Sequence, residues 1–288
     1  MLQNFYVAFN ETSAQILSLT AFVNSKSLKI NLLFFLQDKM LQQQEIHKQF
    51  PIFLQLFQSP YQILGVGIPS STMLFHPIIK QLKKLIKKKT IGKPLTVYHH
   101  FGHYLPNWHP WEDYRNFYVS KKETGAAREV VPFELVWMIH LFSDVYSVYG
   151  DIDKISTLEA NIDDIYQILI EFVNGIKCTF IVDVISEPAI NETRITGDKG
   201  MIYCDHNTGT IKIGKGNKWK EVKIETGKIA KGYKGNTPSD SIYVEEMKSF
   251  LDTIKKSSAR HTFDDELKIL RVLDAIELSN KKSKKIII

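Results

Sequence analysis

Residues 102–142 read GHYLPNWHPWEDYRNFYVSKKETGAAREVVPFELVWMIHLF, and this stretch decides how the chain is interpreted. Its first half interleaves aromatic and polar side chains, among them Tyr104, Trp108, Arg115 and Tyr118. Ring faces beside hydrogen-bond donors suit the binding of a polyhydroxylated ligand. The alternative interpretation is a surface loop whose aromatic residues belong to the core.

A small-residue turn, Gly125-Ala126-Ala127, leads from this loop into a helix-like run with two carboxylates among apolar residues, Glu129 and Glu134. Carboxyl groups in apolar surroundings have pKa values shifted toward neutrality, which acid–base chemistry needs. Glu134 lies deeper in the apolar run, so we prefer it as the proton-transfer residue, with Glu129 as the second candidate.

The bulk composition excludes several classes of protein. With 288 residues and 44% hydrophobic side chains, the chain is long and apolar enough for two folded domains. Its net charge of +6 comes largely from two short runs, residues 80–93 and 281–285, which we interpret as solvated faces and not as a nucleic-acid surface. The longest apolar run is too short to span a membrane, and no signal peptide is evident.

Two cysteines, Cys178 and Cys204, lie in strand-like runs without a partner at metal-ligand or redox-motif spacing. We therefore predict no metal site. The cysteine content indicates a reducing, cytoplasmic location.

The N-terminal third alternates short apolar runs at 5–9, 32–36 and 62–67 with helix-like segments at 16–23 and 42–57. This alternation predicts a parallel sheet with crossover helices. The pattern changes to period two after Gly92, so we place the domain boundary there and predict domains of residues 1–92 and 93–288.

The C-terminal part predicts consecutive hairpins, because strand-like runs flank Asn174-Gly175, residues 197–200 and a later Gly/Lys/Asn turn. Two helices close the chain, beginning near residues 240 and 262. The predicted fold class is α/β and α+β: a partial N-terminal Rossmann-like parallel sheet, then an open, mainly antiparallel sheet with helices packed on one face.

Several segments, in their order and spacing, resemble the glucose–fructose oxidoreductase / inositol dehydrogenase (Gfo/Idh/MocA) family. The resemblance rests on Phe75-His76-Pro77, Ile91-Gly92-Lys93-Pro94, residues 102–110, Asp113-Tyr114-Arg115, the Asn174-Gly175 hairpin and residues 195–202. It implies an N-terminal Rossmann domain that binds NAD or NADP and an open sheet that shapes the substrate site and often the oligomer interface. It also implies hydride transfer at a carbon of a sugar, a cyclitol or a sugar derivative.

The resemblance also implies site residues. Lys39 is similar in position to the family's catalytic lysine, which would hold the reacting hydroxyl. Asn10, after the first apolar run, and Lys39 are the predicted cofactor-binding residues. The predicted substrate-binding residues are Tyr104, Trp108, Arg115, Tyr118 and His76.

The chain departs from the family pattern at two points. Many members carry a histidine as general acid/base after the small-residue turn, whereas this chain has Arg128 to Glu134 there, and Glu134 is the predicted substitute. No Gly-rich phosphate turn is found, because Gly65-Val66-Gly67 is followed by Pro69 and is interpreted as a loop. By the resemblance, residues 1–70 match only the later part of a Rossmann domain.

The prediction is therefore an NAD(P)-dependent oxidoreductase with a sugar-like substrate, a homo-oligomer through its C-terminal sheet, without nucleic-acid or membrane partners. The alternative hypothesis is a non-catalytic remnant that serves as a sugar-binding or assembly module. A third possibility is that a segment with the Gly-rich turn is encoded upstream of Met1.

Overall fold

The computed structural model describes residues 17–23, 30–36, 64–122, 124–224, 241–256 and 259–288. The chain divides into two compact units, residues 1–71 with 245–266 and residues 72–244 with 267–288, and each is described by itself. The predicted domain boundary near Gly92 stays a prediction. Among the described helices, none is both long and apolar enough to cross a membrane.

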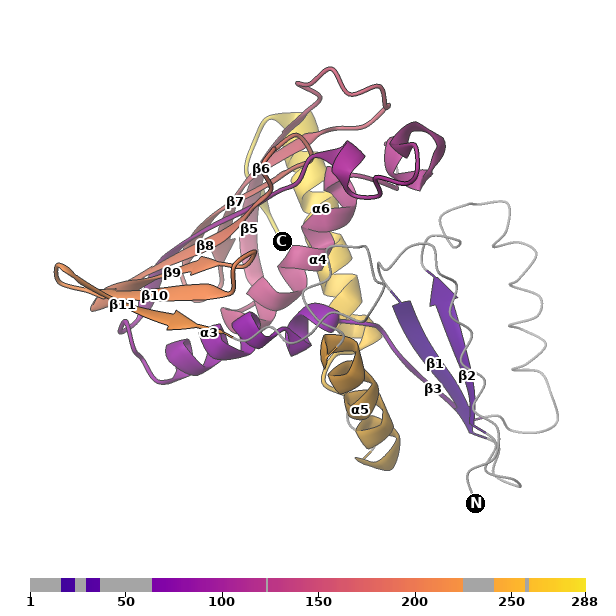
Figure 1. The fold of residues 1–288 in the computed structure, drawn as a ribbon, viewed down its shortest axis with the longest axis horizontal. Helices are drawn as coiled ribbons and strands as arrows, with labels where there is room; N and C mark the ends of the chain where they lie inside the picture. The colour runs from indigo at the N-terminus through magenta and orange to yellow at the C-terminus, as the bar shows by residue number, and fades with distance from the viewer. Residues whose placement is uncertain (1–16, 24–29, 37–63, 123, 225–240, 257–258) are drawn as a thin grey trace. The chain divides into compact units, whose positions relative to one another are not determined.

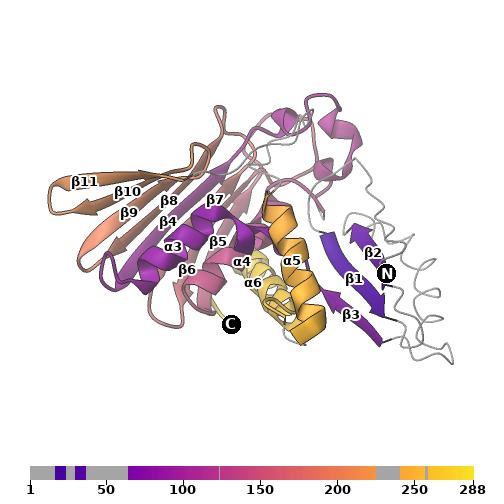
Figure 2. The ribbon, with the colours of Figure 1, turned by 60° about the horizontal axis from the view of Figure 1, so that its bottom comes forward.

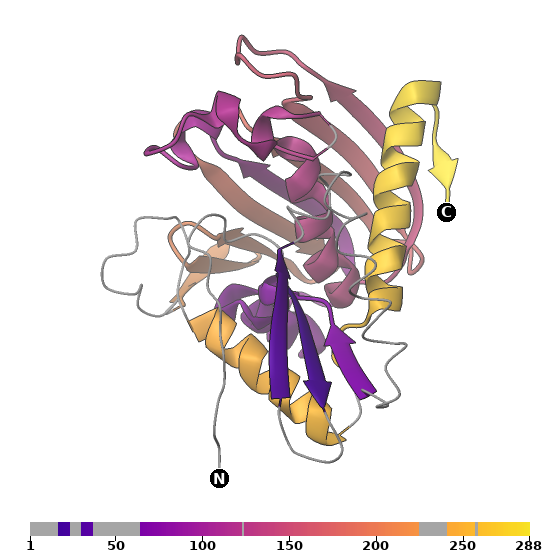
Figure 3. The same ribbon diagram turned by 90° about the vertical axis from the view of Figure 1, so that its right-hand side faces the viewer.

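The first unit contains a three-stranded sheet in the order β2-β1-β3, made of Leu17–Val23 (β1), Ile30–Leu36 (β2) and Leu64–Ile68 (β3) (Figure 3). Both neighbours of β1 run antiparallel to it, so the parallel pairing predicted for this region is wrong for these strands. The helix predicted over residues 16–23 is also wrong, because β1 occupies this segment. Residues 24–29 are too few for the crossover that parallel neighbours require, which explains the antiparallel pairing of β1 with β2.

The second unit contains a nine-stranded sheet in the order β11-β10-β9-β8-β4-β7-β6-β5-β12 (Figure 1). The predicted hairpins are present as β6–β7, β8–β9 and β10–β11, all antiparallel. The sheet is mixed because β4 pairs parallel with β7 and antiparallel with β8. The strands are Pro94–Gly102 (β4), Val145–Asp153 (β5), Ile165–Phe172 (β6), Lys177–Asp183 (β7), Ile190–Gly197 (β8), Gly200–Asp205 (β9), Thr210–Lys215 (β10), Lys218–Lys223 (β11) and Ile286–Ile287 (β12).

Helices lie along one face of this sheet, as predicted (Figure 2). Within the second unit these are α3, α4 and the larger, C-terminal part of α6. Short 3-10 turns shape the aromatic segment between β4 and α4. The helical elements of the chain are Thr72–Phe75 (η1), Pro77–Lys87 (α3), Leu105–Asn107 (η2), Tyr114–Asn116 (η3), Tyr118–Ser120 (η4), Ala127–Leu141 (α4), Ser241–Lys256 (α5) and Phe263–Lys282 (α6).

A row of buried side chains crosses the helix-covered face of the sheet, one from each successive strand. In sheet order its members are Ile211, Cys204, Thr193, His99, Phe180 and Ile168, each paired with the next on the neighbouring strand. Each of these side chains is at most 1% exposed. Four of the six are apolar or thiol side chains. His99 and Thr193 are the two members with strong hydrogen-bonding groups, and they sit directly opposite each other on β4 and β8. The core of this unit therefore contains a polar centre that needs partners.

The turn before α4 has a strained backbone. Ala126, the residue before the first turn of α4, has φ 58° and ψ −132°, a conformation that favours glycine. At the preceding Gly125, an added Cβ would lie 2.3 Å from the Val119 Cα. Gly125 is therefore needed for close backbone approach, and Ala126 adopts a conformation that its own methyl group opposes.

These two positions give opposite predictions for one-methyl changes. Ala126→Gly should raise the free energy of unfolding by about 1 kcal/mol, because relief of strain outweighs the added flexibility of the unfolded chain. Gly125→Ala should lower it by about 3 kcal/mol, because the new methyl group meets backbone atoms. Urea unfolding of both variants tests this, and a destabilised Ala126→Gly variant would contradict the account of the turn.

Candidate functional site

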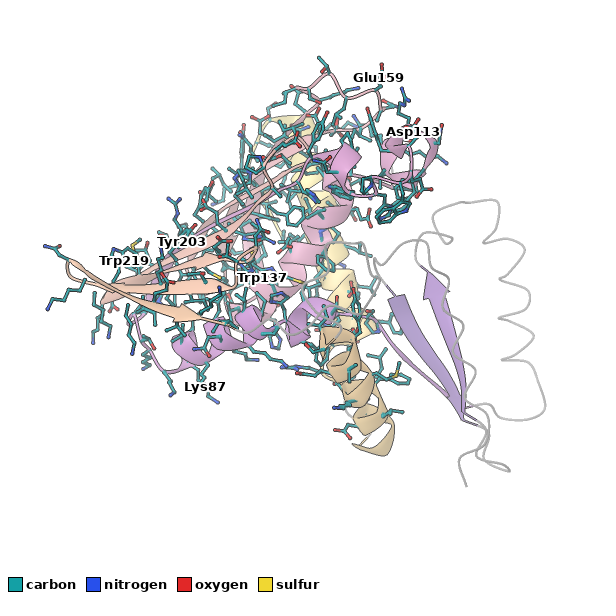
Figure 4. The ribbon with its side chains drawn as sticks, in the orientation of Figure 1. Lys87, Asp113, Trp137, Glu159, Tyr203 and Trp219 are labelled. Carbon is teal, nitrogen blue, oxygen red and sulfur yellow. The ribbon has the colours of Figure 1, made fainter. Side chains whose placement is uncertain are left out.

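The centre of the candidate site is Glu134, whose side chain is 1% exposed. Helical spacing places Glu134 on the same buried stripe of α4 as Val130, Trp137 and Met138. The Trp137 Nε1–H donates to Glu134 Oε2 at 2.5 Å, and His99 Nε2 lies 3.1 Å from the same oxygen. Figure 4 shows Trp137 in the interior, where α4 faces the sheet. An acidic residue on an apolar stripe thus has two hydrogen-bonding partners, as burial requires.

The polar cluster continues across the sheet from His99. His99 Nδ1 lies 2.8 Å from Thr193 Oγ1 and 3.0 Å from the Glu192 carbonyl oxygen. Thr193 Oγ1 in turn lies 2.8 Å from His206 Nε2. We call Glu134, Trp137, His99, Thr193 and His206 the buried polar network.

His76 caps α3 beside this network. Its Nδ1 accepts a hydrogen bond from the Ile78 backbone N–H at 3.3 Å, and its ring centroid is 6.4 Å from that of His206. Burial lowers the pKa of His76 to about 4, while Glu134 opposes this shift and Lys80 adds to it. Burial also lowers the pKa of His206 well below its usual value, and the neighbouring imidazoles of His99 and His76 add to the effect. Two of the predicted site residues, His76 and Glu134, are therefore near enough for the charge of Glu134 to act on His76.

A second pair of predicted residues meets at the start of α4. The Tyr118 hydroxyl donates to Glu129 Oε1 at 2.9 Å. Glu129 lies in the first turn of α4, where a carboxylate is stabilised by the helix dipole. This contact joins the aromatic segment to the acidic helix.

The other rings of the aromatic segment contact one another or pack against the hydrophobic core. Trp108 stacks on His103 and donates its Nε1–H to the His103 carbonyl oxygen at 3.0 Å. Tyr104 is partly buried against the core, and its backbone N–H donates to the Ser186 carbonyl at 2.8 Å. Trp111 stacks on His109 and remains 57% exposed.

Arg115 is engaged by two carboxylates. Its guanidinium donates to both oxygens of Asp113, with Nη2 at 2.8 Å from Oδ2, and its Nη1 lies 2.6 Å from Glu159 Oε2. Figure 4 shows Asp113 and Glu159 at one end of this unit. Any substrate carboxylate or hydroxyl would compete with these contacts, so a substrate-binding role for Arg115 stays a prediction.

Lys39 and Asn10 lie outside the described residues, and so does any cofactor contact that they would make. Gly65 and Gly67 are within β3, where they pair with Phe22 and Thr20 of β1. A strand in a regular ladder does not offer the backbone N–H groups of a phosphate turn. The described residues therefore do not fit the phosphates of a dinucleotide. In the same part of the chain, no group of three or more His, Cys, Asp or Glu side chains is arranged to bind a metal ion.

Sequence reasoning missed four members of the network: His99, Trp137, Thr193 and His206. One signal was available for His99, because Val97, His99 and Phe101 share the period-two face of β4 that packs against the core. Thr193 carried no local signal, since its partner on β4 is distant in sequence. His206 follows the end of β9, and only the tertiary structure places it beside Thr193.

Solved structures that carry the name oxidoreductase or dehydrogenase share the fold of this chain. Residues 79–203 match the family described as the GFO/IDH/MocA C-terminal domain. This match confirms the predicted resemblance to the Gfo/Idh/MocA family for residues 79–203.

Solved structures share this fold at low sequence identity. An oxidoreductase from Agrobacterium radiobacter, in complex with NAD+, L-tartaric acid and magnesium, is 13% identical with a TM-score of 0.63, over 75% of this chain and 63% of its own. A levoglucosan dehydrogenase, in complex with NADH and levoglucosan, is 15% identical with a TM-score of 0.62, over 76% and 65%. A putative NADPH-dependent oxidoreductase from Desulfitobacterium hafniense is 15% identical with a TM-score of 0.61, over 76% and 63%.

The chain spans less than two thirds of the length of each of these structures. At such identities the similarity establishes the fold. A comparison with curated proteins found no match.

The donor on Trp137 gives a stability prediction. Trp137→Phe keeps an aromatic ring but removes the hydrogen bond to the buried Glu134 carboxyl, so the free energy of unfolding should fall by about 2 kcal/mol. Trp111→Phe is the matched control on an exposed ring and should change it by less than about 0.5 kcal/mol. Equal effects of the two substitutions in urea unfolding would contradict the role assigned to Trp137.

The pKa of His76 gives a pH prediction. The folded value of about 4 lies below the unfolded value of 6.5, so the unfolded state binds more protons between these pH values. Stability is therefore lost as pH falls, by about 2 kcal/mol between pH 7 and pH 5 from this residue. His76→Asn keeps a capping side chain without a titrating group and should lose correspondingly less stability over this interval. Thermal melts at the two pH values test this, and equal losses for both proteins would refute it.

Proposed function

We propose that the chain is an NAD(P)-dependent oxidoreductase that acts on a hydroxyl-bearing carbon of a sugar, a cyclitol or a sugar derivative. The observation that carries this proposal is the Gfo/Idh/MocA C-terminal domain at residues 79–203. The same fold occurs in a levoglucosan dehydrogenase solved with NADH and levoglucosan. The proposal takes from these proteins the reaction class and the substrate class.

In this proposal Glu134 accepts or returns the proton of the reacting hydroxyl. Its burial and its two donors support the role, because a carboxyl group in an enclosed polar centre can be tuned for proton transfer. Glu129 is the second carboxylate, joined to the substrate side through Tyr118. Lys39 would hold the hydroxyl, and Asn10 with Lys39 would contact the cofactor. The proposed substrate-side residues are Tyr104, Trp108, Arg115, Tyr118 and His76.

We also propose a homo-oligomer formed through the outer face of the nine-stranded sheet. This face carries a partly exposed cluster in which the Arg194 guanidinium lies 5.4 Å from the Tyr98 ring centroid and 5.7 Å from that of Tyr203. Tyrosine and arginine are enriched in protein interfaces. Two buried free thiols, Cys178 and Cys204, support the proposed reducing, cytoplasmic location.

A second candidate function is a non-catalytic sugar-binding or assembly module. Its motivation is the strand pairing of Gly65 and Gly67, since the described residues offer no phosphate turn. A dinucleotide bound by this chain would depend on residues outside the described ones. Cofactor binding therefore discriminates between the two functions.

Titration of the full chain with NADH and with NADPH, followed by nicotinamide fluorescence, makes this decision. The oxidoreductase proposal predicts saturable binding of one of them below about 1 mM, in the range of ordinary enzyme affinities. A sharply melting protein that shows no saturation at millimolar cofactor would favour the non-catalytic module.

Measurement of kcat then tests the proposed proton-transfer role of Glu134. With levoglucosan, L-sorbose, L-tartrate and myo-inositol as trial substrates, Glu134→Gln should lower kcat at least about 100-fold, the usual contribution of a positioned acid–base group. Glu112→Gln is the control, because Glu112 is exposed and its ion-pair partner is His109, and it should leave kcat unchanged. A Glu134→Gln variant with wild-type turnover would remove Glu134 from the proton-transfer role.

A further inference from the structure

Two ring nitrogens converge on one oxygen of a buried carboxyl group in this protein. Glu134 Oε2 accepts from Trp137 Nε1–H and faces His99 Nε2. His99 is 0% exposed and Glu134 is 1% exposed. At this contact the protonation of the pair is therefore decided mainly by the protein groups that surround it.

The second nitrogen of His99 fixes its protonation. His99 Nδ1 lies 3.0 Å from the Glu192 carbonyl oxygen, which can only accept, so Nδ1 carries a hydrogen. The Thr193 hydroxyl oxygen, at 2.8 Å, can accept from the same N–H and donate its own hydrogen to His206 Nε2. His206 accepts this bond as a neutral ring, which agrees with its strongly lowered pKa.

With Nδ1 protonated, the contact between His99 Nε2 and Glu134 Oε2 needs one further proton between the two atoms. That proton can lie on nitrogen, which gives an imidazolium and a carboxylate, or on oxygen, which gives two neutral groups. Trp137 Nε1–H donates to the same oxygen, and hydrogen bonding to the charged form favours that form. The arrangement therefore favours the ion pair.

The other carboxyl oxygen of Glu134 is differently placed. Within the part of the chain that the structure describes, no hydrogen bond reaches Oε1. His99 and Trp137 thus hold Oε2, and Oε1 is the atom that remains for a ligand. Hydrogen bonds to one oxygen of a carboxylate fix the direction of the other oxygen, and such fixed geometry favours reaction with a bound ligand.

We propose that His99 is a positioning residue: it forms a buried imidazolium–carboxylate pair with Glu134, and this pair presents Glu134 Oε1 to a hydroxyl group of a small polyhydroxylated ligand. The ligand part of this inference rests on the proposed function. The ion pair does not, because it follows from the contacts of His99 alone.

Nitrogen-15 NMR of the full chain with labelled histidine rings tests the ion pair at pH 7 without any cofactor or substrate. Both His99 ring nitrogens should give the shifts of protonated imidazolium nitrogens. In Glu134→Gln the side-chain amide donates to Nε2, so this nitrogen should move to the shift of an unprotonated one. His206 is the internal control and should show a neutral ring in both proteins. A neutral His99 ring in the wild type would overturn the ion pair.

Calorimetric titration with levoglucosan, in the presence of NADH, tests the ligand part. His99→Gln keeps a donor toward Glu134 and should weaken binding less than about 3-fold, whereas His99→Leu removes the donor and should weaken it more than about 10-fold. Trp111→Phe should leave binding unchanged. Equal effects of the two His99 substitutions would overturn the positioning role. If the wild type binds no levoglucosan, the ligand part fails together with the sugar specificity of the proposed function, while the NMR result still decides the ion pair.

Discussion

Burial of the Glu134 carboxyl group is the constraint on which the second unit depends. An unpaired carboxylate in an apolar interior costs several kcal/mol, so α4 can pack against the sheet only where the sheet provides a donor. Trp137, one turn along α4, donates to Glu134 Oε2, and in the proposed ion pair His99 on β4 is the donor from the sheet. The position of α4 over β4 is thereby specified by a polar contact as well as by apolar packing.

The buried polar network bears on the absence of a histidine from the helix after the small-residue turn. The resemblance implies a histidine on the helix after the small-residue turn, and this chain has Glu134 in that helix instead. An imidazole is nevertheless present, but it comes from β4. In the proposed site the carboxyl group thus comes from the helix and the imidazole from the strand, two elements that are distant in sequence.

The local features of the fold were predictable because they depend on neighbouring residues. Asn174-Gly175 predicted the β6–β7 hairpin, and Gly175 has the positive φ of 85° that such a turn requires. The two closing helices, predicted to begin near residues 240 and 262, are α5 from Ser241 and α6 from Phe263. The parallel pairing of β4 with β7 was not predictable, because it joins strands separated by α4 and two further strands.

The candidate site was predictable to a similar extent. Spacing placed Glu134 on an apolar stripe, but its partners on β4, β8 and the end of β9 are brought together only by the sheet order. The prediction of parallel pairing for the N-terminal strands was wrong for a related reason. An alternation of apolar runs specifies neither which strands pair nor their relative direction. The local sequence pattern thus identified the helix with Glu134, whereas the partners of Glu134 from the sheet are known only from the tertiary structure.

A double-mutant cycle between His99 and Glu134 tests the central claim most directly. The free energies of unfolding of His99→Leu, Glu134→Leu and the double variant are compared with that of the wild type. We expect the double variant to lose about 2 kcal/mol less stability than the sum of the two single losses, because each single substitution leaves a buried partner without its bond. Losses that add within about 0.5 kcal/mol would show that the two side chains act independently and would contradict the account.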